Sequence, residues 1–168
     1  MAYTLGQFSA DIRSTLEANP GVDGQQRILE HLTKALLDDE FVKTHLTAEA
    51  CRPRKILYED PDLGFCICGH VYKDGMGKAN PHDHGSAWAI YGLAQGATEM
   101  TDWEIVEKGT DSNPTLVKPT RKHDMKRGDC FHYQVGQVHS PIMGAGTKLI
   151  RVEGRNLDHI QRSNIRAA

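Results

Sequence analysis

The chain has 168 residues, which is enough for one domain with a sizeable core and too few for two ordinary domains. Its 20 basic and 22 acidic residues give a formal net charge of −2, without the basic excess of a protein that binds nucleic acid or a membrane surface. Its apolar runs are too short for a membrane span, its N-terminus lacks the basic segment of a signal peptide, and four cysteines make no disulfide framework. We therefore expect a cytoplasmic protein with reduced thiols.

Residues 1–50 are expected to form a helical segment. Thr4 and Gln7 have the spacing of a capping box before a first amphipathic helix. Asp23 is expected to cap a second helix, which continues or restarts near Asp39. Nothing in these helices is chemically distinctive, so we expect them to pack on a sheet.

Residues 51–168 carry a different pattern, in which apolar residues recur at every second position. Turn signals separate seven strand-like stretches: residues 56–59, 65–72, 87–93, 98–106, 115–118, 129–134 and 148–152. Many short strands with no helix between them indicate a β-sandwich or β-barrel. The predicted fold class is all-β with N-terminal helices, in one domain overall.

The sequence His82-Asp83-His84 places two imidazoles two residues apart. On a strand they point the same way, which suits two neighbouring ligands of one metal ion. A third histidine would complete such a site, and the candidates are His70, His123, His132 and His139.

Around these histidines the sequence resembles the two motifs of the cupin superfamily. The first motif is matched at His82, His84 and Gly96, and the second at Gly128, Gly136 and His139. The resemblance covers about residues 54–153 and implies a single cupin barrel, the double-stranded β-helix or jelly-roll. It also implies that His82, His84 and His139 are the metal ligands. Ala89 stands where the family usually has a glutamate ligand.

The loss of that glutamate has a chemical consequence. Three neutral imidazoles leave the charge of a divalent ion uncompensated, so the site favours anionic ligands such as a thiolate. Fe(II) would use its open positions for oxygen chemistry, and Zn, Ni or Mn would also accept imidazole ligands.

Within the cupins, the chain is most similar to the thiol dioxygenases, of the cysteine dioxygenase type. The similarity rests on the three-histidine set, the helical N-terminal segment, and Pro81-His82-Asp83-His84-Gly85 followed by Trp88. It implies a mononuclear non-haem Fe(II) enzyme that oxidises a small thiol to a sulfinate with O2. The family's Ser-His-Tyr set has no counterpart at residues 149–153.

The remaining site candidates follow from the strand pattern and from this resemblance. Tyr91 shares the face of Ala89, and Arg151 and Glu153 share one face of a late strand, so these three are catalytic candidates. The alternatives are a core tyrosine and a solvated charged strand face. The substrate-binding candidates include Arg54 and Lys55, because the similar family holds the substrate carboxylate with an early-strand arginine. Tyr72 is a further candidate, because it could face the cavity and hydrogen-bond the substrate.

Other functions use the same three histidines. Cupins of this kind include β-diketone-cleaving dioxygenases, and others are lyases or isomerases with Fe, Zn, Ni or Mn. A non-enzymatic cupin that binds a metal or a ligand is a further alternative. The expected partners are a small anionic thiol and O2, without nucleic acid or membrane, and the chain is expected to be a monomer or a homodimer.

Overall fold

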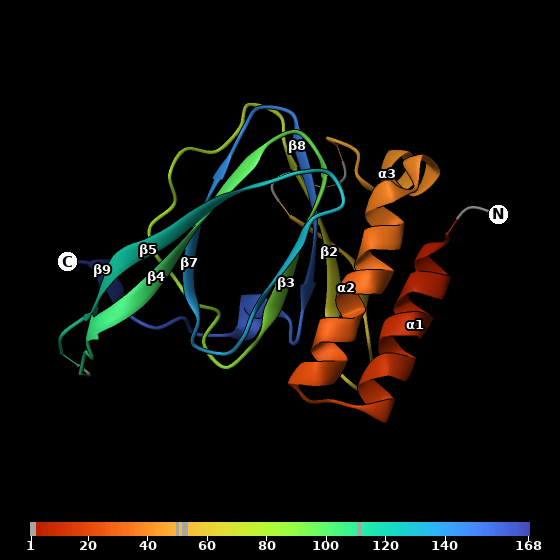
Figure 1. Ribbon diagram of the computed structural model, residues 1–168. Helices are drawn as coiled ribbons and strands as arrows, with labels where there is room; N and C mark the ends of the chain where they lie inside the picture. The colour runs from red at the N-terminus through yellow and green to blue at the C-terminus, as the bar shows by residue number, and fades with distance from the viewer. Residues whose placement is uncertain (1–2, 50, 52–53, 111) are drawn as a thin grey trace.

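The computed structural model describes residues 3–49, 51, 54–110 and 112–168. It consists of two curled β-sheets that face each other, with three helices packed on the outer side of one of them (Figure 1). This mostly β arrangement with N-terminal helices is the fold class expected from the sequence. The expected boundary at residue 50 lies outside the described residues.

The helices follow the sequence signals closely, with one exception. They are α1 (Leu5–Ala18), α2 (Val22–Leu37) and α3 (Asp39–His45). The capping box of Thr4 and Gln7 is confirmed at the start of α1. Asp23 is not the cap of α2, because the helix has already begun after Gly21 and has no side-chain cap. No helix of the described residues combines the length and apolar character that a membrane span requires.

The two sheets differ in their connections. The first sheet has the order β1-β2-β8-β3-β6 and the second has the order β7-β4-β5-β9. Neighbouring strands are antiparallel, except that β9 lies parallel to β5. The strands are β1 (Lys55–Glu59), β2 (Cys66–Tyr72), β3 (Ala89–Gln95), β4 (Thr98–Glu107), β5 (Thr115–Met125), β6 (Cys130–Tyr133), β7 (Val138–Met143), β8 (Thr147–Glu153) and β9 (Ile165–Ala167).

Three strand features were not predicted. The sequence gives no strand signal for β7, because Pro141 interrupts it; the structure tolerates this proline because β7 is at a sheet edge. Strand β5 continues to Met125 instead of ending near residue 118, since its polar outer residues hide the strand period. Strand β9 is only three residues long.

The first sheet is buried on both faces. Its outer face carries Ile90, Ile150 and Val152, which pack with the apolar side chains of the helices. Its inner face carries Tyr91 and Leu149, which belong to a second cluster between the two sheets. Sheets with two buried faces lose the alternation of apolar and polar residues that marks a half-exposed strand.

The close fit of helix α2 against this sheet depends on a glycine. A Cβ atom at Gly92 would lie 2.7 Å from a methyl group of Leu36 and 2.8 Å from one of Leu32. The absent side chain therefore lets the helix approach the strand.

The burial of both faces of the first sheet also applies to the charged residues of β8. Arg151 is 8% exposed and Glu153 is fully buried, so the alternative of a solvated charged face is wrong.

Candidate metal centre

Three histidines from two separate segments of the chain lie close together. One ring nitrogen of each of His82, His84 and His139 lies within 4.8 Å of the others. His139 is on β7, whereas His82 and His84 lie in the irregular segment before β3. The expectation that both lie on a strand is wrong, because this segment pairs with β7 through an isolated bridge instead of a strand: the amides of His82 and His139 each donate to the other's carbonyl at 3.0 Å.

Backbone carbonyls orient two of the three rings. Nδ1 of His82 lies 2.9 Å from the carbonyl oxygen of Asn80, and Nδ1 of His139 lies 3.3 Å from that of Gln137. A carbonyl only accepts hydrogen bonds, so each Nδ1 carries the proton and donates it. The lone pair then resides on Nε2, which is the usual arrangement in a metal-ligating histidine.

The surroundings keep these imidazoles neutral. Burial, together with the charge of its neighbours, lowers the pKa of His84 far below its ordinary value, and burial does the same for His139. The pKa of His82 is also lowered, mainly by burial. Neutral imidazole is the form that binds a metal ion. The donor set therefore fits a divalent ion such as zinc or ferrous iron.

No carboxylate joins the three histidines among residues 3–49, 51, 54–110 and 112–168. Ala89 is fully buried and pairs with Glu153 across the strands, and its methyl group offers no ligand to a metal ion. The other candidate histidines also lie outside this group of three.

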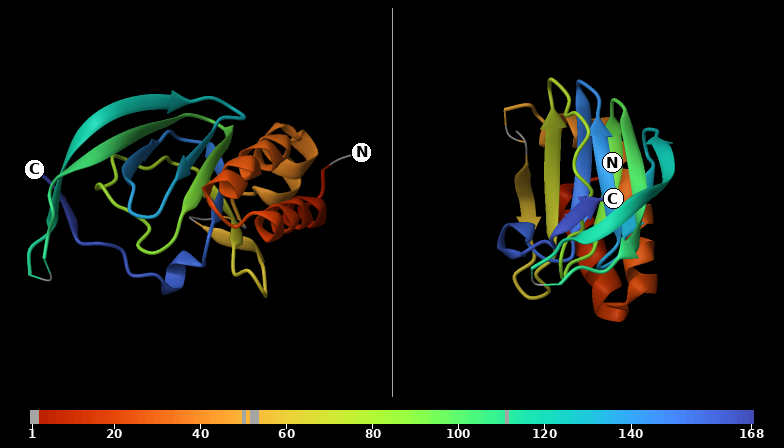
Figure 2. Two further views of the ribbon diagram at one scale, coloured as in Figure 1. Left: turned by 60° about the horizontal axis from the view of Figure 1, so that its bottom comes forward. Right: turned by 90° about the vertical axis from the view of Figure 1, so that its left-hand side faces the viewer.

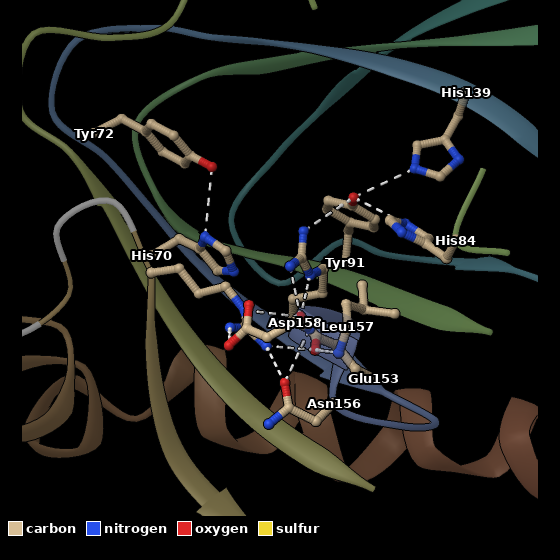
Figure 3. A network of polar contacts seen from close by, with 11 residues as sticks. His70, Tyr72, His84, Tyr91, His139, Glu153, Asn156, Leu157 and Asp158 are labelled. Carbon is tan, nitrogen blue, oxygen red and sulfur yellow. Dashed lines mark hydrogen bonds and ion pairs between the residues drawn. The ribbon is translucent and has the colours of Figure 1, made fainter. Parts of the chain in front are cut away.

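Tyr91 on β3 contacts the metal-ligand candidates directly. Its hydroxyl oxygen lies 3.1 Å from Nε2 of His84 and 3.3 Å from Nε2 of His139 (Figure 3). Nη1 of Arg151 donates to the same oxygen at 3.4 Å. The phenol is thus held where it can give or accept a hydrogen bond beside the ring nitrogens of His84 and His139.

Glu153 lies at the centre of a buried ion-pair network. It accepts hydrogen bonds from Nε of Arg151 at 2.8 Å and from Nη2 of Arg54 at 2.8 Å (Figure 3). Burial alone would raise the pKa of this carboxyl group, but the two guanidinium groups lower it below its ordinary value. Glu153 is therefore an ionised partner of two arginines.

The two early-strand candidates for binding the substrate carboxylate, Arg54 and Lys55, lie elsewhere in the structure. Arg54 is bound by Glu153 and by Asp158. Lys55 is exposed at the start of β1, opposite Gly69. Neither residue lines the cavity next to the metal-ligand candidates.

That cavity has a volume of about 290 Å³, and two arginines line it. Its walls include Tyr72, His82, Tyr91, Arg151 and Arg162. Arg162 was not foreseen from the sequence, because it lies in a C-terminal stretch with no periodic pattern and no motif. No carboxylate of the described ranges forms an ion pair with Arg162, so its charge is available to a bound anion.

His139 is further supported from its other face. The ring of Tyr133 stacks on it with the centroids 3.9 Å apart and the planes 19° from parallel. The Tyr133 hydroxyl donates to Asp102 at 3.1 Å, which fixes the phenol ring.

A larger cavity of about 430 Å³ is lined by Asp102 and Tyr133 and by none of the three histidines, so we place the chemistry in the smaller cavity.

No protein-family model matches this chain, and no curated protein does. Similar solved structures include a cupin superfamily protein from Desulfitobacterium hafniense, with 13% identity and a TM-score of 0.45 over 61% of this chain and 76% of that one. KdgF from Halomonas sp. has 20% identity and a TM-score of 0.45 over 64% and 82%. The cupin domain of Schizosaccharomyces pombe Cnp3 has 12% identity and a TM-score of 0.44 over 61% and 60%. Similarity at this level assigns no activity to the chain.

Proposed function

We propose that this chain is a cupin with a jelly-roll barrel, and that it is an Fe(II)-dependent dioxygenase of the cytoplasm, active as a monomer or homodimer. Its substrate is a small thiol that also carries a carboxylate, and the product is the sulfinate. The observation that supports this proposal is a set of three neutral imidazoles without a carboxylate ligand, beside a cavity that two arginines line.

His82, His84 and His139 would hold the metal. When bound, ferrous iron supplies redox chemistry and open coordination positions for a thiolate and O2. Because the ligands are neutral, the site keeps the full dication charge and favours anions. In the overall reaction a thiol and one O2 molecule give one sulfinic acid, with both oxygen atoms on sulfur.

The cavity residues have distinct proposed roles. Arg162 binds the substrate carboxylate, for which a planar guanidinium offers a two-pronged hydrogen bond. Arg151, fixed by Glu153, adds positive charge and orients the Tyr91 hydroxyl. Tyr91 donates a hydrogen bond beside the ligands, and Tyr72 closes the cavity wall.

The same three histidines are equally compatible with a β-diketone-cleaving dioxygenase, or with a lyase or isomerase that uses Fe, Zn, Ni or Mn. A non-enzymatic metal-binding or ligand-binding cupin is the remaining alternative. Measuring O2 consumption with thiols and with a diketone distinguishes these functions, because a lyase, an isomerase or a non-enzymatic cupin would consume no O2.

The test combines metal analysis with oxygen uptake. Protein purified without a chelator or a nickel column is assayed for metal content and then for O2 consumption with cysteine, 3-mercaptopropionate, cysteamine and pentane-2,4-dione. We expect iron, and one O2 consumed per sulfinate formed with a carboxylate-bearing thiol. His82→Ala should lose most of the metal, and the exposed His159→Ala is the matched control. The thiol proposal is overturned if the protein consumes O2 with pentane-2,4-dione but with none of the thiols. It is also overturned if none of the four compounds causes O2 consumption.

A further inference from the structure

The C-terminal strap, defined as residues 160–168, connects the two sheets. It leaves the short helix η1 (Leu157–His159), which follows β8 of the first sheet, and ends in β9 on the second sheet (Figure 2). Its far end is fixed by backbone hydrogen bonds of 2.9 Å from Thr115 to Asn164 and from Ala168 to Val117. The strap therefore passes beside the cavity that Arg162 lines.

The strap is also bound to Asp83, the residue between His82 and His84, through Ser163. The amide of Ser163 donates to Oδ1 of Asp83 at 3.0 Å, and its hydroxyl donates to Oδ2 at 2.5 Å. Asp83 is only 4% exposed, although a solvated side chain is the ordinary expectation for this residue. Its third donor is the amide of Gly85 at 3.0 Å.

Asp83 depends on the strap for its hydrogen bonds. Among the described residues it forms no ion pair with Lys or Arg, and two of these three donors belong to Ser163. A buried carboxylate that lost them would bear a large desolvation cost. The burial of Asp83 is therefore stable only while the strap is docked.

A glycine lets the strap backbone lie directly on this turn. Gly85 has a φ of +58°, and a Cβ atom there would lie 2.3 Å from the carbonyl oxygen of Gln161. Arg162 is thus held between a residue packed on Gly85 and a residue bonded to Asp83. Without these two contacts, the exposed side chain of Arg162 could adopt many conformations.

We propose that Asp83 and Ser163 form a latch that positions Arg162 over the metal cavity, and that this latch sets the affinity of the site for a small anion. Asp83 and Ser163 are positioning residues that act through Arg162. The anion class, a carboxylate with a thiolate, rests on the proposed function. The latch itself rests only on the contacts described above.

The latch is tested by trypsin cleavage after Arg162 in the metal-loaded protein, followed by mass spectrometry. Ser163→Ala should accelerate this cleavage about tenfold, because it removes a hydrogen bond to a charged acceptor. Ser163→Thr keeps the hydroxyl and should restore the slow rate. Cleavage after the exposed Arg155, outside the strap, is the internal control. Equal rates in wild type and Ser163→Ala overturn the latch.

The role of the latch in binding is tested with 3-mercaptopropionate in the absence of O2. Arg162→Ala and Ser163→Ala should each weaken binding about tenfold, whereas Arg166→Ala on the same strap should not. In the Arg162→Ala background, Ser163→Ala should add no further loss. Additive losses, or no binding of the probe to wild type, overturn the positioning role. A wild type that binds the probe but consumes no O2 overturns the proposed activity and leaves the latch standing.

Discussion

Glu153 offers a sharp test of how the buried charges are held together. We predict that Glu153→Gln strongly lowers the free energy of unfolding at pH 7. The carboxylate is fully buried and accepts five hydrogen bonds: two from Arg54, two from Arg151 and one from the amide of Leu157. Glutamine keeps the shape of the side chain, but it removes the charge and turns one acceptor into an NH2 group that faces a guanidinium.

The magnitude follows from the burial of the partners. Arg151 is almost as buried as Glu153, so the variant would leave an uncompensated positive charge between the sheets. Breaking a buried ion pair by removing one partner costs about 3–5 kcal/mol. For a chain of this size, each kcal/mol lowers Tm by about 2–4 °C, so a decrease of roughly 6–20 °C is expected.

Urea unfolding at pH 7, supported by a thermal scan, measures this cost. The matched control is Glu104→Gln. Glu104 forms an ion pair with Lys118 at 2.8 Å, and the side chains of both residues are more than half exposed. This substitution should change stability by less than about 1 kcal/mol. If Glu153→Gln were as stable as this control, Glu153 would not hold the two arginines by their charge.

Three further outcomes are expected. Gly92→Ala should destabilise the fold by about 1–3 kcal/mol in urea unfolding, because its methyl group would push the leucines of α2 away, whereas Gly77→Ala, with open space around it, should not. Asp60→Asn should cost stability at pH 7, and the difference from wild type should shrink as the pH falls below about 4. Burial opposes ionisation of Asp60, but its hydrogen bonds and Arg13 keep its folded pKa below the unfolded value, so its contribution exists above that value and is lost in acid. A pH-independent difference would contradict this assignment. Tyr91→Phe should retain the metal by elemental analysis but lower kcat about 10- to 100-fold, because its hydroxyl hydrogen-bonds the ligand rings; an unchanged kcat would show that its hydroxyl has no role in the reaction.

Local signals in the sequence were sufficient for the helices and for the three histidines. The capping box at Thr4 acts within one turn of chain, so it can be seen without the fold. The spacing of His82, His84 and His139 was recognisable because the two motifs place their histidines at fixed distances from turn glycines. The strand that carries His139 was nevertheless missed, since a proline at a sheet edge is tolerated only in the context of that edge.

The charged residues of the site could not be assigned from the sequence alone. Arg151 and Glu153 alternate with apolar residues as they would on a solvated strand, and only the packing of helices on one face and of a second sheet on the other shows that both are buried. The same packing pairs Arg54 with Glu153 across 99 residues of chain.

The contact that brings Arg162 to the cavity spans a similar distance. Asp83 and Ser163 are 80 residues apart, and neither belongs to a recognisable motif for such a pair. The sequence by itself identified His82 and His84 as a pair by their spacing, and the resemblance to two known motifs selected His139 from four candidates; that the three rings lie together is a result of the fold. The choice of the cation that faces a bound anion was decided by the tertiary structure, because it depends on which arginines are already neutralised by a buried carboxylate and which one the strap leaves free.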